Sequence, residues 1–298
     1  MKINKSKQAL LLVGAEHLFG NYITEELINR NIPIKALNTN LYPKRNDELL
    51  FSISDKNSTD STNSLKSYLC DVKTVISCIE GATIYDLCTC YRNNTRLIQE
   101  TNKIKVEKIV FVFSTVCSLQ KNAHVLAERK RFLVELKKSG INYTIIKTHG
   151  LFVNFVDFLS MASKGKVYLF GNGKQQFNPI HLKDLAIACI DAIEINVNEI
   201  CLGGPEILTS NYIAEMAFSA LGKPATIIHL PKYIEKLITW KTRLFKPSPY
   251  LTPINLCTVS LKENCISLKY GTQSLATFFK DEVNALKKYS KRENLFNS

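Results

Sequence analysis

A turn bounded by two glycines near the start of the chain has the clearest chemical meaning in the sequence. Gly14 and Gly20 enclose five residues, directly after the apolar run 9–13. Between a strand and a helix, such glycines permit a tight bend, close backbone approach to a pyrophosphate and close helix packing, and the helix N-terminus offers N–H donors. The turn therefore predicts a dinucleotide site; the alternative is glycine serving backbone conformation only. The expected contacts are Gly14, Ala15, His17, Leu18, Phe19 and Gly20.

Two residues inside this turn depart from the usual pattern. His17 carries a side chain where a bare glycine backbone is usual. Glu16 places a carboxylate near the expected pyrophosphate, which it repels unless the side chain points away. Both residues weigh against tight nucleotide binding.

The end of the second predicted strand bears on the choice of cofactor. NAD-binding turns usually carry Asp or Glu at this point, and an Arg suits NADP. The chain has Asn38 and Thr39 there, with Lys44 and Arg45 a few residues later, where they could reach a 2′-phosphate. The missing acid favours NADP over NAD.

Two hydroxyl residues follow the apolar run 108–113. Ser114 and Thr115 fall at the carboxyl edge of the predicted sheet, where α/β proteins bind their ligands. We expect them to hydrogen-bond to a substrate or to the nicotinamide ribose, or simply to satisfy the strand end.

These residues are positioned by an alternation of short apolar strands and longer helical segments. Such units, about 30 residues apart, indicate right-handed βαβ crossovers and a parallel sheet covered on both faces. The sequence thus predicts a doubly wound α/β (Rossmann) fold. Strands are expected at 9–14, 32–37, 49–53, 72–79, 108–113 and 143–147, and helices at 21–30, 85–101 and 125–138.

After Gly150 the pattern changes to shorter strands and helices. Thr209 is expected to cap a helix that ends at Leu221, before Gly222. This region predicts a smaller C-terminal α/β lobe for substrate. We expect a nucleotide-binding domain over 1–155 with the returning segment 176–203, and the lobe over 204–298 with segment 156–175.

Composition excludes several classes of protein. Hydrophobic residues make up 45% and charged residues 22% of the 298 residues, as in a folded globular protein. No apolar run is long enough to cross a membrane, and no cleavage site follows the first one, so a cytoplasmic location is expected. The nine cysteines include no CxxC pair, which predicts buried free thiols and no metal site.

The net charge of +13 is concentrated toward the C-terminus. Segment 230–246 is basic and amphipathic, which fits association with an anionic membrane or a protein complex, or a helix that closes the substrate pocket. No nucleic-acid-binding motif is present, so no nucleic acid partner is expected. The basic tail around Lys287–Arg292 is expected to be a frayed, solvated end.

Over residues 8–280 the chain resembles the NmrA-like, NAD(P)H-binding group of atypical short-chain dehydrogenases/reductases. VGAEHLFG at 13–20 resembles the family's GATGxxG turn. The most specific stretches are FNPIHLKDLA at 177–186 and GGPEILT at 203–209. Further matches lie in VISCIEGAT (75–83), VFVFSTV (110–116), ELKKSGINYTIIKTHGLFVN (135–154) and YGTQSLATFF (270–279). The resemblance implies an extended Rossmann fold, NADP or NAD as cofactor, and a small organic substrate.

The resemblance also implies further cofactor contacts. Asp55 matches the family's adenine-side Asp, and Lys147 stands where the family has Arg. Cys78, Ile79 and Glu80 belong to the segment that passes over the cofactor in the family.

The family's active-site motif departs here. In Tyr-x-x-x-Lys, the Tyr supplies a proton and the Lys lowers its pKa and holds the ribose. The Tyr position falls on Val125, which cannot transfer a proton, and the Lys position on Arg129, with Lys130 as a register-shifted candidate. The neighbouring His124 is expected to face solvent.

Two functional interpretations stay open. The chain is an NAD(P)H-dependent oxidoreductase whose proton comes from solvent, the substrate or another side chain, or it is a non-catalytic sensing or assembly protein with a degenerate site. His149 would lie near the nicotinamide, and His181 and Asp184 could serve as an acid/base pair, but structural roles are favoured for all three.

Overall fold

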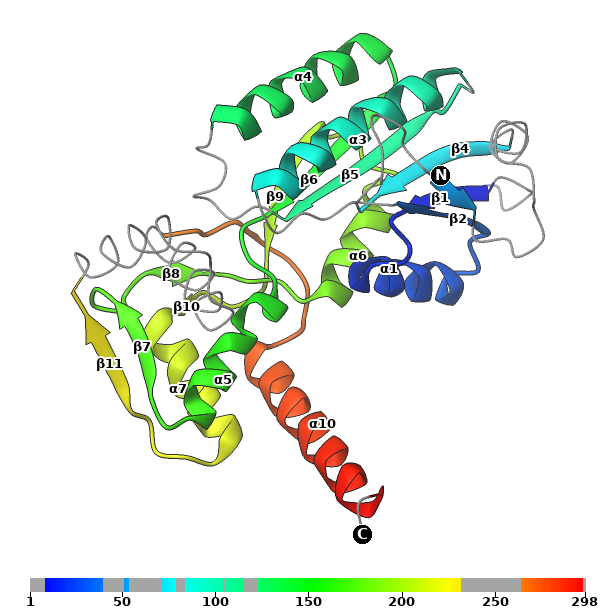
Figure 1. Ribbon diagram of the computed structural model, residues 1–298. Coiled ribbons are helices and arrows are strands. Elements are labelled where there is room, and N and C mark those ends of the chain that lie inside the picture. Colours follow the sequence, from blue (N-terminus) through cyan, green and yellow to red (C-terminus); the bar gives the residue numbers. More distant parts are fainter. Residues whose placement is uncertain are drawn as a thin grey trace. The chain divides into compact units, whose positions relative to one another are not determined.

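The computed structural model describes residues 9–39, 51–53, 71–78, 84–103, 105–114, 123–231 and 264–296 (Figure 1). The chain divides into two compact units. The first comprises Met1–Thr115, Leu119–Lys147 and Leu185–Cys201, and the second comprises Val116–Ser118, Thr148–Asp184 and Leu202–Ser298.

The first unit is built on a mainly parallel sheet with the strand order β9-β6-β5-β4-β1-β2-β3. Strand β1 pairs in parallel with β2 on one side and β4 on the other, so the direction of winding reverses between β1 and β4. Only β3 is antiparallel among the described pairings of this unit. The strands are β1 Ala9–Val13, β2 Ile34–Thr39, β3 Phe51–Ile53, β4 Val72–Ser77, β5 Lys108–Ser114, β6 Asn142–Thr148 and β9 Glu199–Gly203.

Helices cover both faces of this sheet, as the alternation in the sequence predicts. The helices are α1 Leu18–Asn29, α3 Ile84–Lys103, α4 Ala123–Ser139 and α6 Leu182–Asp191. Figure 1 shows α3 and α4 together on one face and α1 on the other. Arg30 follows α1 and pairs with Asp191 at the end of α6, with an Nη1–Oδ1 distance of 2.7 Å. The doubly wound α/β fold is confirmed.

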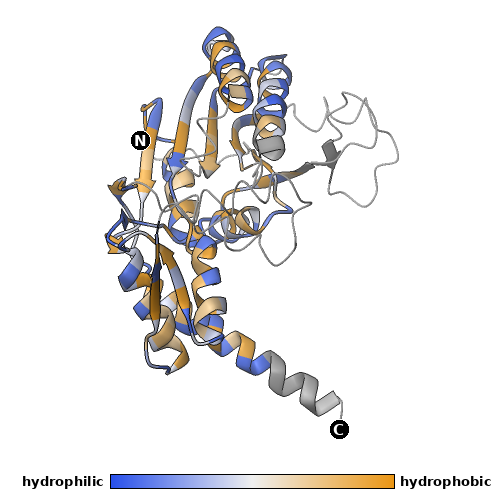
Figure 2. Ribbon diagram, turned by 60° about the vertical axis from the view of Figure 1, so that its left-hand side comes forward, coloured by the Kyte–Doolittle hydropathy of each residue, from blue (hydrophilic) through white to orange (hydrophobic). Residues whose placement is uncertain are grey.

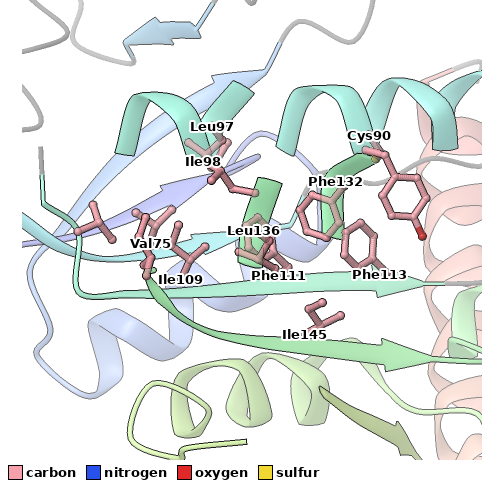
Figure 3. Close-up of a cluster of buried hydrophobic side chains, with 14 of the residues drawn as sticks. Val75, Cys90, Leu97, Ile98, Ile109, Phe111, Phe113, Phe132, Leu136 and Ile145 are labelled. Carbon is pink, nitrogen blue, oxygen red and sulfur yellow. The ribbon is translucent and has the colours of Figure 1, made fainter. Parts of the chain in front are cut away.

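An apolar cluster between the sheet and the pair α3 and α4 forms the main core of the first unit. Phe111 lies edge-on to Phe132, with ring centroids 5.0 Å apart, and Phe113 packs against the same ring (Figure 3). Figure 2 shows hydrophobic and hydrophilic residues on the same helices, as expected for helices with one buried face. Burial of this apolar surface fixes α4 over β5.

The second unit contains short strands and a helical core. Its helices are η2 Phe152–Phe155, α5 Val156–Ser163, α7 Ser210–Leu221 and α10 Leu275–Phe296, and its strands are β7 Val167–Phe170, β8 Gln176–Phe177, β10 Leu208–Thr209, β11 Ile227–Leu230 and β12 Leu268–Lys269. Strand β7 pairs with β11, β8 with β10, and β12 with the last residues of β9. The predicted ends of α7 are confirmed, because Thr209 Oγ1 accepts a hydrogen bond from Tyr212 N and Gly222 adopts a left-handed φ of 66°.

The basic tail differs from expectation. Helix α10 continues to Phe296, so the expected frayed end is helical instead. Leu275, Phe279 and Val283 are buried at four-residue spacing and anchor the first half of the helix. Extending an anchored helix adds one hydrogen bond per ordered residue, which explains its length. Segment 232–246, named above for membrane or partner association, lies outside the described residues.

A lysine is buried at the start of β5. Lys108 is 9% exposed, and its Nζ donates to Thr144 Oγ1 and to the Ile195 carbonyl, each at 2.8 Å. No carboxylate among the described residues pairs with it. Burial lowers the pKa of Lys108 because the charged ammonium loses solvation.

We predict that this lysine makes stability depend on pH. Its pKa is lower in the folded than in the unfolded chain, so the unfolded chain binds more protons between the two values and stability rises with pH there. The free energy of unfolding of the wild type should therefore increase relative to Lys108→Met as pH rises toward 10. Urea unfolding at several pH values measures this difference, with the exposed Lys137→Met as control. A difference that does not change with pH would contradict the prediction.

Candidate dinucleotide-binding site

The glycine turn lies directly at the carboxyl end of β1. Gly14 has a φ of +88°, which favours glycine, and its N–H donates to the Leu37 carbonyl of β2 at 2.9 Å. A Cβ at this position would stand 3.1 Å from the Cys78 carbonyl oxygen. The turn is thus held closely between the ends of β2 and β4.

Gly20 lets helix α1 pack onto this turn. It lies in the first turn of α1. Glycine fits there because a Cβ would stand 2.3 Å from the backbone oxygen of Gly14. Backbone cannot retreat as a flexible side chain can. The contact therefore directs the start of α1 at the turn, as in glycine-rich dinucleotide sites.

The N-terminus of α1 has the properties of an anion site. Its N-cap, His17, has extended backbone geometry and makes no side-chain capping hydrogen bond. The first N–H groups of an α-helix have no intrahelical acceptor, and the helix dipole is positive at this end. Of the predicted contacts, Ala15, Leu18 and Phe19 belong to this segment, with Leu18 55% exposed and Phe19 buried.

Glu16 and His17 pair with each other. The imidazole Nε2 lies 3.4 Å from the carboxylate Oε1, and both side chains are partly buried. The contact holds the Glu16 carboxylate beside the imidazole of the residue that follows it.

The structure describes only some of the other predicted cofactor contacts. Cys78 is fully buried beneath the turn, with its Sγ 3.2 Å from the Val13 carbonyl oxygen. Lys147, on β6, forms an ion pair with Glu199 of the neighbouring β9. Asp55, Ile79, Glu80 and Thr115 lie outside the described residues, as do the side chains of Asn38, Thr39 and Ser114.

Helix α4 carries the residues at the family's catalytic positions. Val125 is 2% exposed and belongs to the apolar core of the first unit. Arg129, one turn later, is half-buried, whereas Lys130 and His124 are exposed. The helix therefore turns Arg129 toward its buried side and Lys130 away from it.

Three buried polar residues on β4 and α3 were not predicted from the sequence. Ser77, the last residue of β4, donates its hydroxyl to Asn94 Oδ1 on α3 at 2.6 Å, and both are buried. Tyr91 lies one turn before Asn94 and is 4% exposed. Burial raises the pKa of Tyr91 to about 12, opposed by the positive charge of Arg129. The available signal was the spacing of two polar residues on the buried side of a helix.

His181 and Asp184 have structural partners within the second unit. The His181 ring stacks edge-on against Phe152 and Phe278, and burial lowers its pKa. Asp184 is 2% exposed, and its Oδ2 accepts backbone N–H bonds from Thr272 and Gln273. These contacts fasten the segment before α10.

Comparison with known proteins supports this fold. No family model matches the chain. The chain is 24% identical over 253 residues to the chloroplastic divinyl chlorophyllide a 8-vinyl-reductase of Cucumis sativus; the match covers 76% of this chain and 60% of that protein. The chain thus spans less than two thirds of the length of this curated relative.

Solved structures resemble the chain over most of its length. One is UDP-glucose 4-epimerase of Thermotoga maritima, solved with UDP-glucose, with a TM-score of 0.64, 12% identity and coverage of 95% of this chain and 99% of that one. Another is WbmH of Bordetella bronchiseptica in complex with NAD+, with a TM-score of 0.60, 12% identity and the same coverage. The Rossmann-type fold implied by the resemblance to short-chain dehydrogenases/reductases is confirmed. The narrower NmrA-like assignment stays a prediction.

The described residues contain no helix with the length and apolarity needed to cross a membrane. They also contain no group of three or more His, Cys, Asp or Glu side chains arranged to hold a metal ion.

We predict that Gly20→Ala separates α1 from the turn. The added methyl would overlap the Gly14 carbonyl, so we expect a loss of about 1–3 kcal/mol in stability and a loss of at least about tenfold in NADPH affinity. Chemical denaturation and calorimetry measure the two effects. Gly222→Ala is a matched control, because its φ of 66° is strained for alanine but its Cβ would meet no atom within 4 Å. The prediction is wrong if Gly20→Ala binds NADPH as tightly as the control.

Proposed function

We propose that this chain binds a nicotinamide dinucleotide and reduces a small organic substrate. The observation that carries the proposal is the tight contact between Gly14 and Gly20, which aims the uncapped N-terminus of α1 at the carboxyl edge of the sheet. This edge, between β1 and β4, is the switch point where open α/β sheets bind ligands. The relative named for an 8-vinyl-reductase supports the reduction, and the neighbour solved with NAD+ supports the cofactor class.

The chain's own residues would hold the dinucleotide by charge and by backbone hydrogen bonds. The N–H groups of Leu18, Phe19 and Gly20 would face the pyrophosphate. Arg129 would hydrogen-bond to ribose hydroxyls in place of the family's Lys. When bound in its reduced form, the cofactor supplies a hydride. NADP is favoured over NAD, because neither Asn38 nor Thr39 offers a carboxylate to a ribose 2′-hydroxyl.

The substrate class follows from hydride chemistry. A hydride adds to a carbon made electron-poor by a carbonyl group, either at the carbonyl itself or at the end of a conjugated double bond. The activity named for the curated relative is a vinyl reduction, which is the reduction of a carbon–carbon double bond. We therefore propose ketones, aldehydes and conjugated enones as the classes to screen.

A second function is favoured by one observation. Val125, at the position of the family's proton donor, is buried in an apolar core. A water molecule therefore has no access to that position to act as the donor instead. A protein that binds the nucleotide for sensing or assembly needs no donor. The two functions differ in turnover, since the second predicts nucleotide binding without oxidation of NADPH by any substrate.

Calorimetric titration with NADPH and NADH tests the proposed function. We expect a dissociation constant in the micromolar range, with NADPH the tighter ligand. Gly14→Asp should abolish binding, because a side chain would strain a φ of +88° and add negative charge beside the phosphates. Absence of binding by the wild type would refute the proposal.

Arg129→Gln and Lys130→Gln distinguish the two cations that the sequence leaves open. Loss of a charge-assisted hydrogen bond costs about 1.5–3 kcal/mol, so Arg129→Gln should weaken NADPH binding by roughly 10- to 100-fold. Lys130 is exposed, and its variant should bind within about twofold of the wild type. The opposite ranking would assign the role to Lys130.

A further inference from the structure

Reduction of a carbonyl or an enone requires a proton as well as a hydride. The family's donor position is Val125, which has no proton to give and is 2% exposed in the core. The remaining sources are solvent, the substrate and another side chain. We consider the third source, another side chain, and its role rests on the proposed function.

A phenol lies at the level of the glycine turn. In the sheet, Val13 of β1 is level with Ser77 of β4, which is level with Phe111 of β5. Phe113 is two residues further along β5, just past the level of Gly14. The ring of Tyr91 on α3 lies 5.0 Å from that of Phe113. Tyr91 is therefore at the carboxyl edge, two strands from the turn, or roughly 10 Å at ordinary strand spacing.

The same phenol lies beneath α4. The rings of Tyr91 and Phe132 are 5.8 Å apart, and Arg129 precedes Phe132 by one helical turn. Residues three apart share a helix face, which places the half-buried guanidinium above this part of the core. Within the described residues, Arg129 forms no ion pair with a carboxylate. Its positive charge acts on the Tyr91 hydroxyl.

The other groups that act on Tyr91 are largely neutral or balanced. Glu199 would disfavour a phenolate, but its carboxylate is paired with Lys147. Cys88 and Cys90 are buried free thiols. Burial raises the pKa of Tyr91 to about 12, so the hydroxyl carries its proton at neutral pH, as a donor must. Arg129 is the cation that would stabilise the anion left after proton transfer.

We propose that Tyr91 donates the proton of the reduction, so that a phenol on α3 replaces the missing phenol on α4. The bound cofactor would supply the hydride for a new C–H bond at the carbonyl carbon or the conjugated carbon. The Tyr91 O–H bond breaks, and its proton goes to the substrate oxygen, giving an alcohol or an enol. The phenolate is stabilised by Arg129, a positioning residue in this step, and regains a proton from solvent.

Tyrosine labelled with 13C at Cζ provides a test that does not depend on knowing the substrate. The variant Tyr91→Phe keeps the ring and identifies the Tyr91 resonance by its absence. Tyr143→Phe identifies a control, because Tyr143 packs against the same apolar cluster but lies at the start of β6, on the opposite edge. Saturation with NADP+ and the variant Arg129→Gln should each shift the Tyr91 resonance and leave the Tyr143 resonance in place.

Turnover provides the second readout. Ketones, aldehydes and enones are first screened for those that the wild type reduces with NADPH. With these substrates, Tyr91→Phe should lower kcat by about 10²–10⁴-fold, as for loss of a general acid. Its NADPH affinity should stay within about twofold of the wild type, and Tyr143→Phe should keep full kcat.

The outcomes separate this inference from the proposed function. Absence of calorimetric binding of NADPH and NADH overturns both. Binding with an unmoved Tyr91 resonance, or an unchanged kcat in Tyr91→Phe, overturns only the role of Tyr91. Binding without turnover of any compound by the wild type also overturns that role and leaves a non-catalytic nucleotide-binding protein.

Discussion

The contact between the first turn of α1 and the end of β1 is the constraint on which the candidate site depends. Without a side chain at Gly20, the backbone of α1 reaches the Gly14 carbonyl, and any Cβ would enter the space of that oxygen. Gly14 itself turns with a positive φ against the end of β4. Two glycines thus bring the positive end of a helix to the carboxyl edge of the sheet, where the direction of winding reverses between β1 and β4. The proposed anion site depends on that arrangement.

Aromatic packing positions helix α4 on the face of the sheet opposite α1. Phe111, Phe113 and Phe132 fix α4 over β5, and Tyr91 fills the adjoining space from α3. This packing brings a phenol near the guanidinium of Arg129, although the two residues come from separate helices. The position usually occupied by a phenol holds Val125, which completes the core instead. Tyr91 and Val125 therefore belong to the same apolar cluster, and of the two only Tyr91 carries a hydroxyl.

Local patterns in the sequence predict most of the architecture. Continuous apolar runs predict the buried strands, and Thr209 and Gly222 predict both ends of α7 because capping depends on adjacent residues only. The relation of Tyr91 to Arg129 depends on how α3 packs against α4, which no local pattern contains. The length of α10 was likewise missed, since burial of Leu275, Phe279 and Val283 stabilises a helix whose later residues are highly polar. The roles of the predicted cofactor contacts stay predictions.

Hydrogen exchange at the start of α1 tests the central claim most directly. We predict that saturating NADPH slows amide exchange at Leu18, Phe19 and Gly20, because these N–H groups gain phosphate acceptors that the free helix does not supply. The N-terminus of α7, capped by Thr209, should exchange at the same rate with and without the nucleotide. Unchanged exchange at the start of α1 under saturating NADPH would contradict the claim that this turn binds a dinucleotide.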